Sequence, residues 1–113
     1  AGRWDAARAA WARAAALRPR AAVHRLNLAA ALLELGSHAE CINLCKEIIS
    51  TVRAASNSPD IKDIVEDMTP QELIVKAYLR IGNSFFKRGR HQRAFNAFLV
   101  AAKEGEGAGA GQA

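Results

Sequence analysis

The stretch KAYLRIGNSFFKRGRHQRAFNAF, residues 76–98, decides the fold because it contains a spacing that the chain uses three times. A glycine, Gly89, is followed five residues later by a small residue, Ala94. A bulky residue, Phe98, comes four positions further on, and an apolar one, Ala101, three after that. Two earlier sets have the same spacing, namely Gly36, Cys41, Cys45 and Ile48, and before them Gly2, Ala7, Trp11 and Ala14.

The offsets between the three sets predict a repeat architecture. The first two are 34 residues apart, and the third follows the second by 53, which is 34 plus 19. A period of 34 is typical of helix–turn–helix units that stack into a solenoid. We therefore predict an all-α solenoid of about two and a half repeats over residues 1–104, with an insertion at about 54–69 before the last repeat. The Gly- and Ala-rich residues 105–113 are expected to form a flexible tail.

The first repeat is predicted to have only its second helix, because no helical pattern precedes Gly2. The abrupt start suggests a piece of a longer protein, and we expect upstream sequence or a partner to cover the face that carries Trp11.

Local signals place the individual helices near residues 3–17, 21–35, 38–53, 70–87 and 90–103. Thr69 and Glu72, with Pro70 between them, form a capping box, and Ser37 with Glu40 is interpreted as another. A short helix is also predicted after Ser58 and Pro59, since the insertion has an apolar stripe with helical spacing. The residues of this stripe are Ile61, Ile64, Val65 and Met68.

Composition limits the classes of function. The net charge of +5 favours acidic partners, and nucleic-acid binding is kept as a less favoured alternative because the basic residues are mostly scattered. No apolar run reaches the roughly 18–20 residues of a membrane span. With two cysteines and no secretion signal, we expect a reducing, cytoplasmic location.

Catalytic and metal chemistry are not expected. Cys41 and Cys45 share one helical face, but they stand at core positions of the repeat, which favours buried thiols over a metal or redox pair. His24, His38 and His91 fall at a helix start and two turns. We therefore predict that the chain is not an enzyme and binds no cofactor.

The third copy resembles the tetratricopeptide repeat (TPR) family. Tyr78, Ile81, Gly82 and Phe85 conservatively match the first-helix signature W-x2-L-G-x2-Y, and Ala94 with Phe98 matches the A-x3-F of the second helix. In this family the first, or A, helices line a concave groove that binds other proteins. On those helices Lys76, Arg80 and Asn83 share one face of the third copy, and Asn27 and Glu34 lie on the groove side of the second.

Asn27 together with KAYLR, residues 76–80, resembles the carboxylate clamp of co-chaperone TPR domains. KAYLRIGNSFFK, residues 76–87, is similar to the middle TPR domain of the heat-shock organising co-chaperones. The resemblance implies binding of an acidic C-terminal peptide of a heat-shock chaperone, with the ninety-kilodalton class favoured. It places the clamp's remaining Lys and Asn on the first A helix, and a polar peptide contact where this chain has Leu73. The alternative is a structural TPR segment in a larger assembly.

Overall fold

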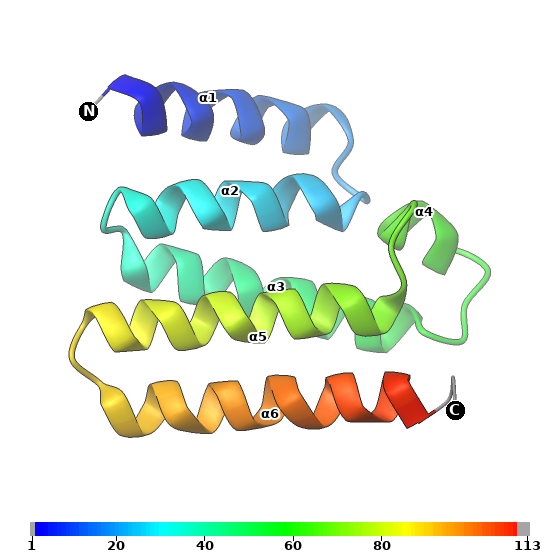
Figure 1. The fold of residues 1–113 in the computed structure, drawn as a ribbon. Coiled ribbons are helices and arrows are strands. Elements are labelled where there is room, and N and C mark those ends of the chain that lie inside the picture. The colour runs from blue at the N-terminus through cyan, green and yellow to red at the C-terminus, as the bar shows by residue number, and fades with distance from the viewer. Residues whose placement is uncertain (1, 111–113) are drawn as a thin grey trace.

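The computed structural model describes residues 2–110, and these residues form helices joined by short connections, with no strand among them (Figure 1). The described part of the chain is a slab of 43 × 36 × 21 Å. The helices are α1 (Gly2–Leu17), α2 (Ala22–Glu34), α3 (His38–Ala55), α4 (Ile61–Val65), α5 (Pro70–Lys87) and α6 (His91–Ala110).

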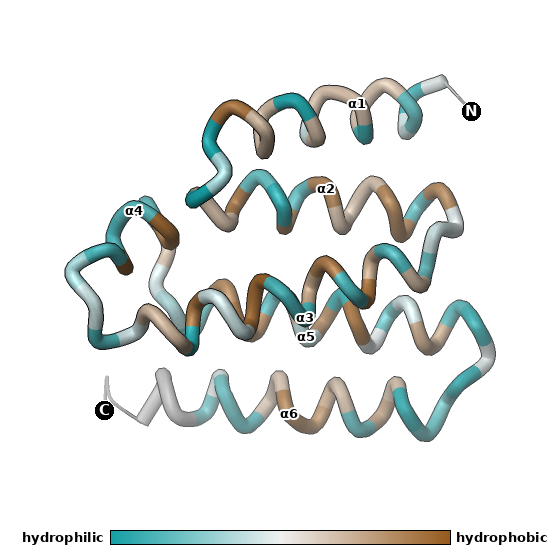
Figure 2. The backbone as a smooth tube through the Cα atoms, turned by 180° about the vertical axis from the view of Figure 1, so that it is seen from behind, coloured by the Kyte–Doolittle hydropathy of each residue, from teal (hydrophilic) through white to brown (hydrophobic). Residues whose placement is uncertain are grey.

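The long helices stack in the order expected of a repeat solenoid. Successive helices run in opposite directions, and α1 packs on α2, α2 on α3, and α5 on α6. α5 also packs against both α2 and α3, with α3 behind it in Figure 1 and in front of it in Figure 2. The second repeat is therefore the pair α2–α3 and the third is α5–α6, while α1 is the second helix of the first. The predicted all-α solenoid is confirmed.

The turns inside the second and third repeats have the same backbone geometry. Gly36 and Gly89 have φ values of +81° and +76°, which favour glycine. The amide of Gly36 donates to the Leu33 carbonyl at 3.1 Å, and that of Ser37 to the Leu32 carbonyl at 2.9 Å. The same two bonds follow Gly89, at 3.0 and 2.8 Å. This pattern is a Schellman motif, so the 53-residue offset read from the sequence joins two structurally equivalent turns.

Of the two predicted capping boxes, one is confirmed and one is wrong. The Thr69 hydroxyl accepts from the Glu72 amide at 3.1 Å, and the Glu72 carboxylate accepts from the Thr69 amide at 3.4 Å. The Ser37 side chain makes no capping bond at the start of α3. Its ψ of 63° departs from the extended backbone of a capping residue, because Ser37 also closes the Schellman motif of α2.

The insertion contains the predicted short helix, and its apolar stripe faces the core. Ile64 and Val65 on α4 are buried, and Ile61 and Met68 pack partly against the same core. α4 contacts α2, α3 and α5 at the end of the bundle where α2 and α5 begin and α3 ends (Figure 1). Two ion pairs join the insertion to the α1–α2 connection, Arg20–Asp60 at 2.8 Å and Arg18–Glu66 at 3.0 Å. The insertion therefore closes one end of the helix stack.

The end of α6 differs from the prediction. The helix continues to Ala110 instead of ending near residue 103, so it includes residues 105–110 of the expected tail. Each glycine costs a helix about 1 kcal/mol relative to alanine, which is why the composition suggested a tail. An ion pair of 2.7 Å between Arg53 of α3 and Glu104 of α6 joins α6 to the second repeat. Glu104 is the residue just after the predicted end of the helix. Residues 111–113 of the predicted tail lie outside the described residues.

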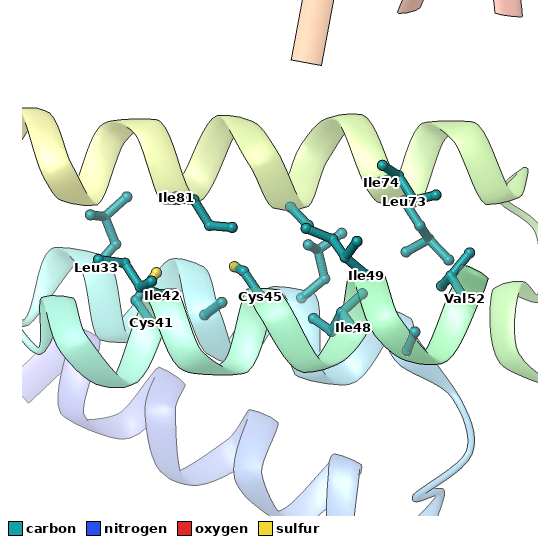
Figure 3. Close-up of a cluster of buried hydrophobic side chains, with 14 of the residues drawn as sticks. Leu33, Cys41, Ile42, Cys45, Ile48, Ile49, Val52, Leu73, Ile74 and Ile81 are labelled. Atoms are coloured by element: carbon teal, nitrogen blue, oxygen red, sulfur yellow. The ribbon is translucent and has the colours of Figure 1, made fainter. Parts of the chain in front are cut away.

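The core is centred on α3, which is covered by α2 on one side and α5 on the other (Figure 3). Fully buried side chains along it include those of Ile48, Val52 and the two cysteines, with Leu73 of α5 beside them. Cys41 and Cys45 are both free and fully buried. The prediction that they fill core positions of the repeat is confirmed.

Candidate peptide-binding face

The two A helices, α2 and α5, pack against each other and run in the same direction (Figure 1). An ion pair of 3.7 Å between Glu34 and Lys87 joins their last turns. Because the two helices are related by the 53-residue offset, the repeat aligns Asn27 with Arg80 and Glu34 with Lys87. An amide and a guanidinium therefore occupy the same repeat position on neighbouring helices.

The five predicted site residues differ in exposure and in contacts. Asn27 and Arg80 are half-buried, and Glu34, Lys76 and Asn83 are exposed. The Arg80 Nη1 donates to the backbone carbonyl of Lys76 at 3.5 Å, which directs the guanidinium along α5. Within the described residues an ion pair links Glu34 to Lys87, and a hydrogen bond links Arg80 to the backbone of Lys76. They do not join Asn27 or Asn83 to either pair.

Lys76 and Arg80 border different neighbours of α5. Lys76 lines a cavity of about 310 Å³ with Val75, Leu79 and Gly105, which lies between α5 and the end of α6. The positive charge of Arg80 is instead close enough to α3 to lower the pKa of Cys41. Lys76 thus borders a cavity toward α6, and the charge of Arg80, one turn further along the same side of α5, acts on a thiol of α3.

Leu73 is fully buried in the core. The resemblance places a polar peptide contact at this position. In this chain the leucine packs in the cluster that includes Ile48 and Val52, so it contributes to stability and does not reach a ligand.

The two buried thiols influence each other's ionisation. The hydrogen bond with Cys45 lowers the pKa of Cys41 to about 7, opposed by burial and assisted by the Ser84 hydroxyl and the charge of Arg80. The same hydrogen bond, together with burial, raises the pKa of Cys45 far above that of an ordinary thiol.

The sequence did not predict a role for Ser84, which is a fully buried residue. Its only signal was its position 53 residues after the small residue Ala31.

These opposite shifts predict that the contribution of the two thiols to stability is largest near pH 9. Cys41 has a folded pKa below its unfolded value of 9.0, so its contribution is lost as pH falls from 9 toward 7. Cys45 has a folded pKa above 9.0, so its contribution is lost as pH rises past 9. Urea unfolding from pH 6.5 to 10.5 measures both slopes. Subtracting the curve of the Cys45→Ala variant should isolate the slopes that the two thiols cause. If the variant has the same pH profile as the unchanged chain, the thiols are not the cause of the slopes.

Two histidines pack against aromatic rings. His24 on α2 stacks on Trp11 of α1 with ring centroids 6.1 Å apart. His91, the first residue of α6, meets Phe86 edge-on at 5.0 Å.

No three metal-ligating side chains gather among residues that the structure describes. Nor does any helix in that part of the chain have the length and apolar character to cross a membrane.

Comparison with protein families matches the first part of the chain. A family model described as tetratricopeptide repeat matches residues 1–59, just over half of the sequence. The match covers α1, α2 and α3, and the third repeat, outside it, is related to the second by the shared turn and core positions. No solved structure matches the chain.

Proposed function

The chain belongs to the tetratricopeptide repeat family, whose repeats mediate protein–protein interaction, and on this premise we propose that it is a co-chaperone-type adaptor. Its ligand would be the acidic C-terminal peptide of a heat-shock chaperone, of the ninety-kilodalton class. The peptide would lie across α2 and α5 and be held by a carboxylate clamp of Asn27, Lys76 and Arg80. Glu34 and Asn83 would border it.

One observation carries the proposal, the equivalence of Asn27 and Arg80 on adjacent A helices. An amide donor on one helix and a guanidinium on the next can both donate to carboxylates of an extended peptide that crosses them. Arg80 is half-buried and directed by its bond to the Lys76 carbonyl. A partly ordered guanidinium loses less conformational entropy when it binds than a free surface arginine does.

The expected affinity is modest. Charge-assisted hydrogen bonds contribute about 1.5–3 kcal/mol each, and an extended peptide loses entropy on docking. We therefore expect a dissociation constant on the order of 1–100 μM, near −8 kcal/mol at the tighter end. Binding should weaken with added salt, because exposed charges are screened beyond a Debye length of about 8 Å at physiological ionic strength.

The test is a fluorescence anisotropy titration with a labelled peptide ending in Met-Glu-Glu-Val-Asp. Arg80→Glu should weaken binding about 10- to 150-fold, the equivalent of losing one charge-assisted bond. Arg13→Glu on α1 is the matched control, since it makes the same change of net charge at an exposed arginine on a different helix. A peptide with an amidated C-terminus tests whether a free terminal carboxylate is needed.

Two results would reject the clamp. If Arg80→Glu and Arg13→Glu weaken binding equally, the interaction is a response to net charge. If the amidated peptide binds as tightly as the free acid, the clamp does not hold a terminal carboxylate. The second result would favour the alternative of a scaffold segment that uses other surfaces.

A further inference from the structure

The last repeat has an apolar face that nothing in the described chain covers. Leu79 and Phe86 on α5 are 41% and 57% exposed, and Phe95 and Leu99 on α6 are 55% and 44% exposed. Together these four residues are called the α5–α6 face. Phe86 and Phe95 also line a cavity of about 340 Å³ at the α5–α6 turn. Leu79 lines the cavity of about 310 Å³ toward the other end of the two helices.

The second repeat shows what covers the equivalent surface. Moving back 53 residues relates Leu79 to Leu26, Phe86 to Leu33 and Phe95 to Ile42. These three equivalents are only 2%, 8% and 5% exposed, and they belong to the core where α5 packs on α2 and α3. Figure 3 shows Leu33 and Ile42 between α3 and α5. The α5–α6 face is therefore the repeat equivalent of a surface that is buried by a helix.

We propose that the α5–α6 face binds one amphipathic helix of a partner protein, in the position that α5 takes on α2 and α3. The helix would run parallel to α5, so that its C-terminal end lies at the α5–α6 turn. This interaction surface adjoins the peptide-binding face proposed above, since Lys76 and Leu79 line the same cavity, but the α6 side chains Phe95 and Leu99 belong to the α5–α6 face alone.

Charge defines the partner helix further. In the second repeat, Glu34 at the end of α2 pairs with Lys87 at the end of the covering helix. The equivalent of Glu34 in the third repeat is Lys87 itself, followed by the exposed Arg88 and Arg90. The position that carries a negative charge in the second repeat therefore carries a positive charge in the third. The last turn of the partner helix should accordingly be acidic, where the covering helix α5 has a lysine. The negative end of its helix dipole would meet the same cations.

Side-chain size adds a second requirement. Leu33, Ile42 and Cys45 in the second repeat correspond to Phe86, Phe95 and Phe98 in the third. Because the face carries larger side chains, the central residues of the partner helix should be small. A second copy of this chain fits poorly. The helix of a second copy that could bind here is α1, which is the least covered and is rich in alanine. Its C-terminal end is followed by Arg18 and Arg20, and these would lie against the positive side chains at the α5–α6 turn.

The probe for this proposal is the chain's own covering helix, a fluorescein-labelled peptide of residues 70–87 with Lys87→Glu. Three further changes are made in the peptide. Leu79→Gln and Phe86→Gln keep its outward side polar, and Ile81→Ala, at a residue that is buried in the second repeat's core, supplies the small central side chain that the face requires. Anisotropy titration against the full chain should show saturable binding. Phe95→Asp in the chain should weaken it at least tenfold. Leu17→Asp, which places the same charge at a 78% exposed apolar residue on α1, should leave it unchanged.

A charge exchange tests the predicted orientation. The probe that keeps Lys87 should bind the chain at least threefold more weakly than the Glu probe. With Lys87→Glu in the chain, that order should reverse. Arg80→Glu should not affect this probe, just as Phe95→Asp should not affect the acidic peptide, so the two proposals fail independently. Circular dichroism confirms that each variant is folded.

Three results would overturn the proposal. The first is no saturable binding of either probe, and the second is an equal loss with Phe95→Asp and Leu17→Asp. The third comes from sedimentation equilibrium of the chain alone. A dimer that dissociates on Phe95→Asp would identify the occupant of the face as a second copy.

Discussion

Leu73→Ala on α5 is expected to lower the free energy of unfolding by about 2–5 kcal/mol. Leu73 is fully buried among core side chains of α3, and removing its isobutyl group leaves a cavity that close-packed helices fill only partly. A small domain has a total stability of only about 5–15 kcal/mol, so the variant should lose a large share of it. Urea unfolding followed by circular dichroism measures the difference.

Leu79→Ala is the matched control. It makes the same substitution in the same helix, so helix propensity changes equally, but Leu79 is 41% exposed. A loss of about 1 kcal/mol or less is expected, since much of its apolar surface stays in water. Equal losses at the two positions would mean that Leu73 is not a core residue.

The second large effect is expected at Gly82 in the middle of α5. A Cβ atom there would lie 2.4 Å from the ring of Phe98 on α6, closer than van der Waals contact allows. Gly82→Val should force α5 and α6 apart or displace the ring. We expect a loss of about 3 kcal/mol, the upper end of the usual range for overpacking. Thermal or urea unfolding gives the value.

Gly105→Val on α6 is the control for this substitution, because a Cβ atom there meets nothing within 4 Å. Valine has the higher helix propensity, so this variant should be neutral or slightly more stable. Adding Phe98→Ala to Gly82→Val should recover part of the loss, because it removes the side chain that clashes. Strictly additive effects of the two changes would show that the ring is not the cause.

The architecture could be predicted because the repeat spacing acts at the positions that decide packing. The glycines at 36 and 89 mark turns that need a left-handed residue, and the residues five positions later, Cys41 and Ala94, are buried. The apolar stripe of the insertion was predictable for the same reason, since its apolar side chains recur at helical spacing in an otherwise polar segment, namely Ile61, Ile64, Val65 and Met68. Such signals can be read from nearby residues in the sequence, and they are reliable because the residues concerned must be buried for the helices to pack.

The errors arose where one residue serves two elements or where a tertiary contact outweighs composition. Ser37 fits a capping sequence, yet its backbone conformation is set by the turn that ends α2. The Gly-rich end of α6 stays helical next to the Arg53–Glu104 contact. The clamp residues are harder to judge from sequence. Spacing places Lys76 and Arg80 on one side of a helix, but the neighbours of α5 decide which way each cation faces.

The position of α1 has a consequence for how unfolding of this chain is observed. Both tryptophans, Trp4 and Trp11, lie in α1, which packs on α2 alone and has no buried residue in its whole length. Helical repeats are coupled mainly to their neighbours, so a terminal helix with one neighbour opens more easily than the centre of the stack. Tryptophan emission therefore follows the opening of α1. Far-ultraviolet ellipticity follows every helix of residues 2–110, so the two signals describe different equilibria.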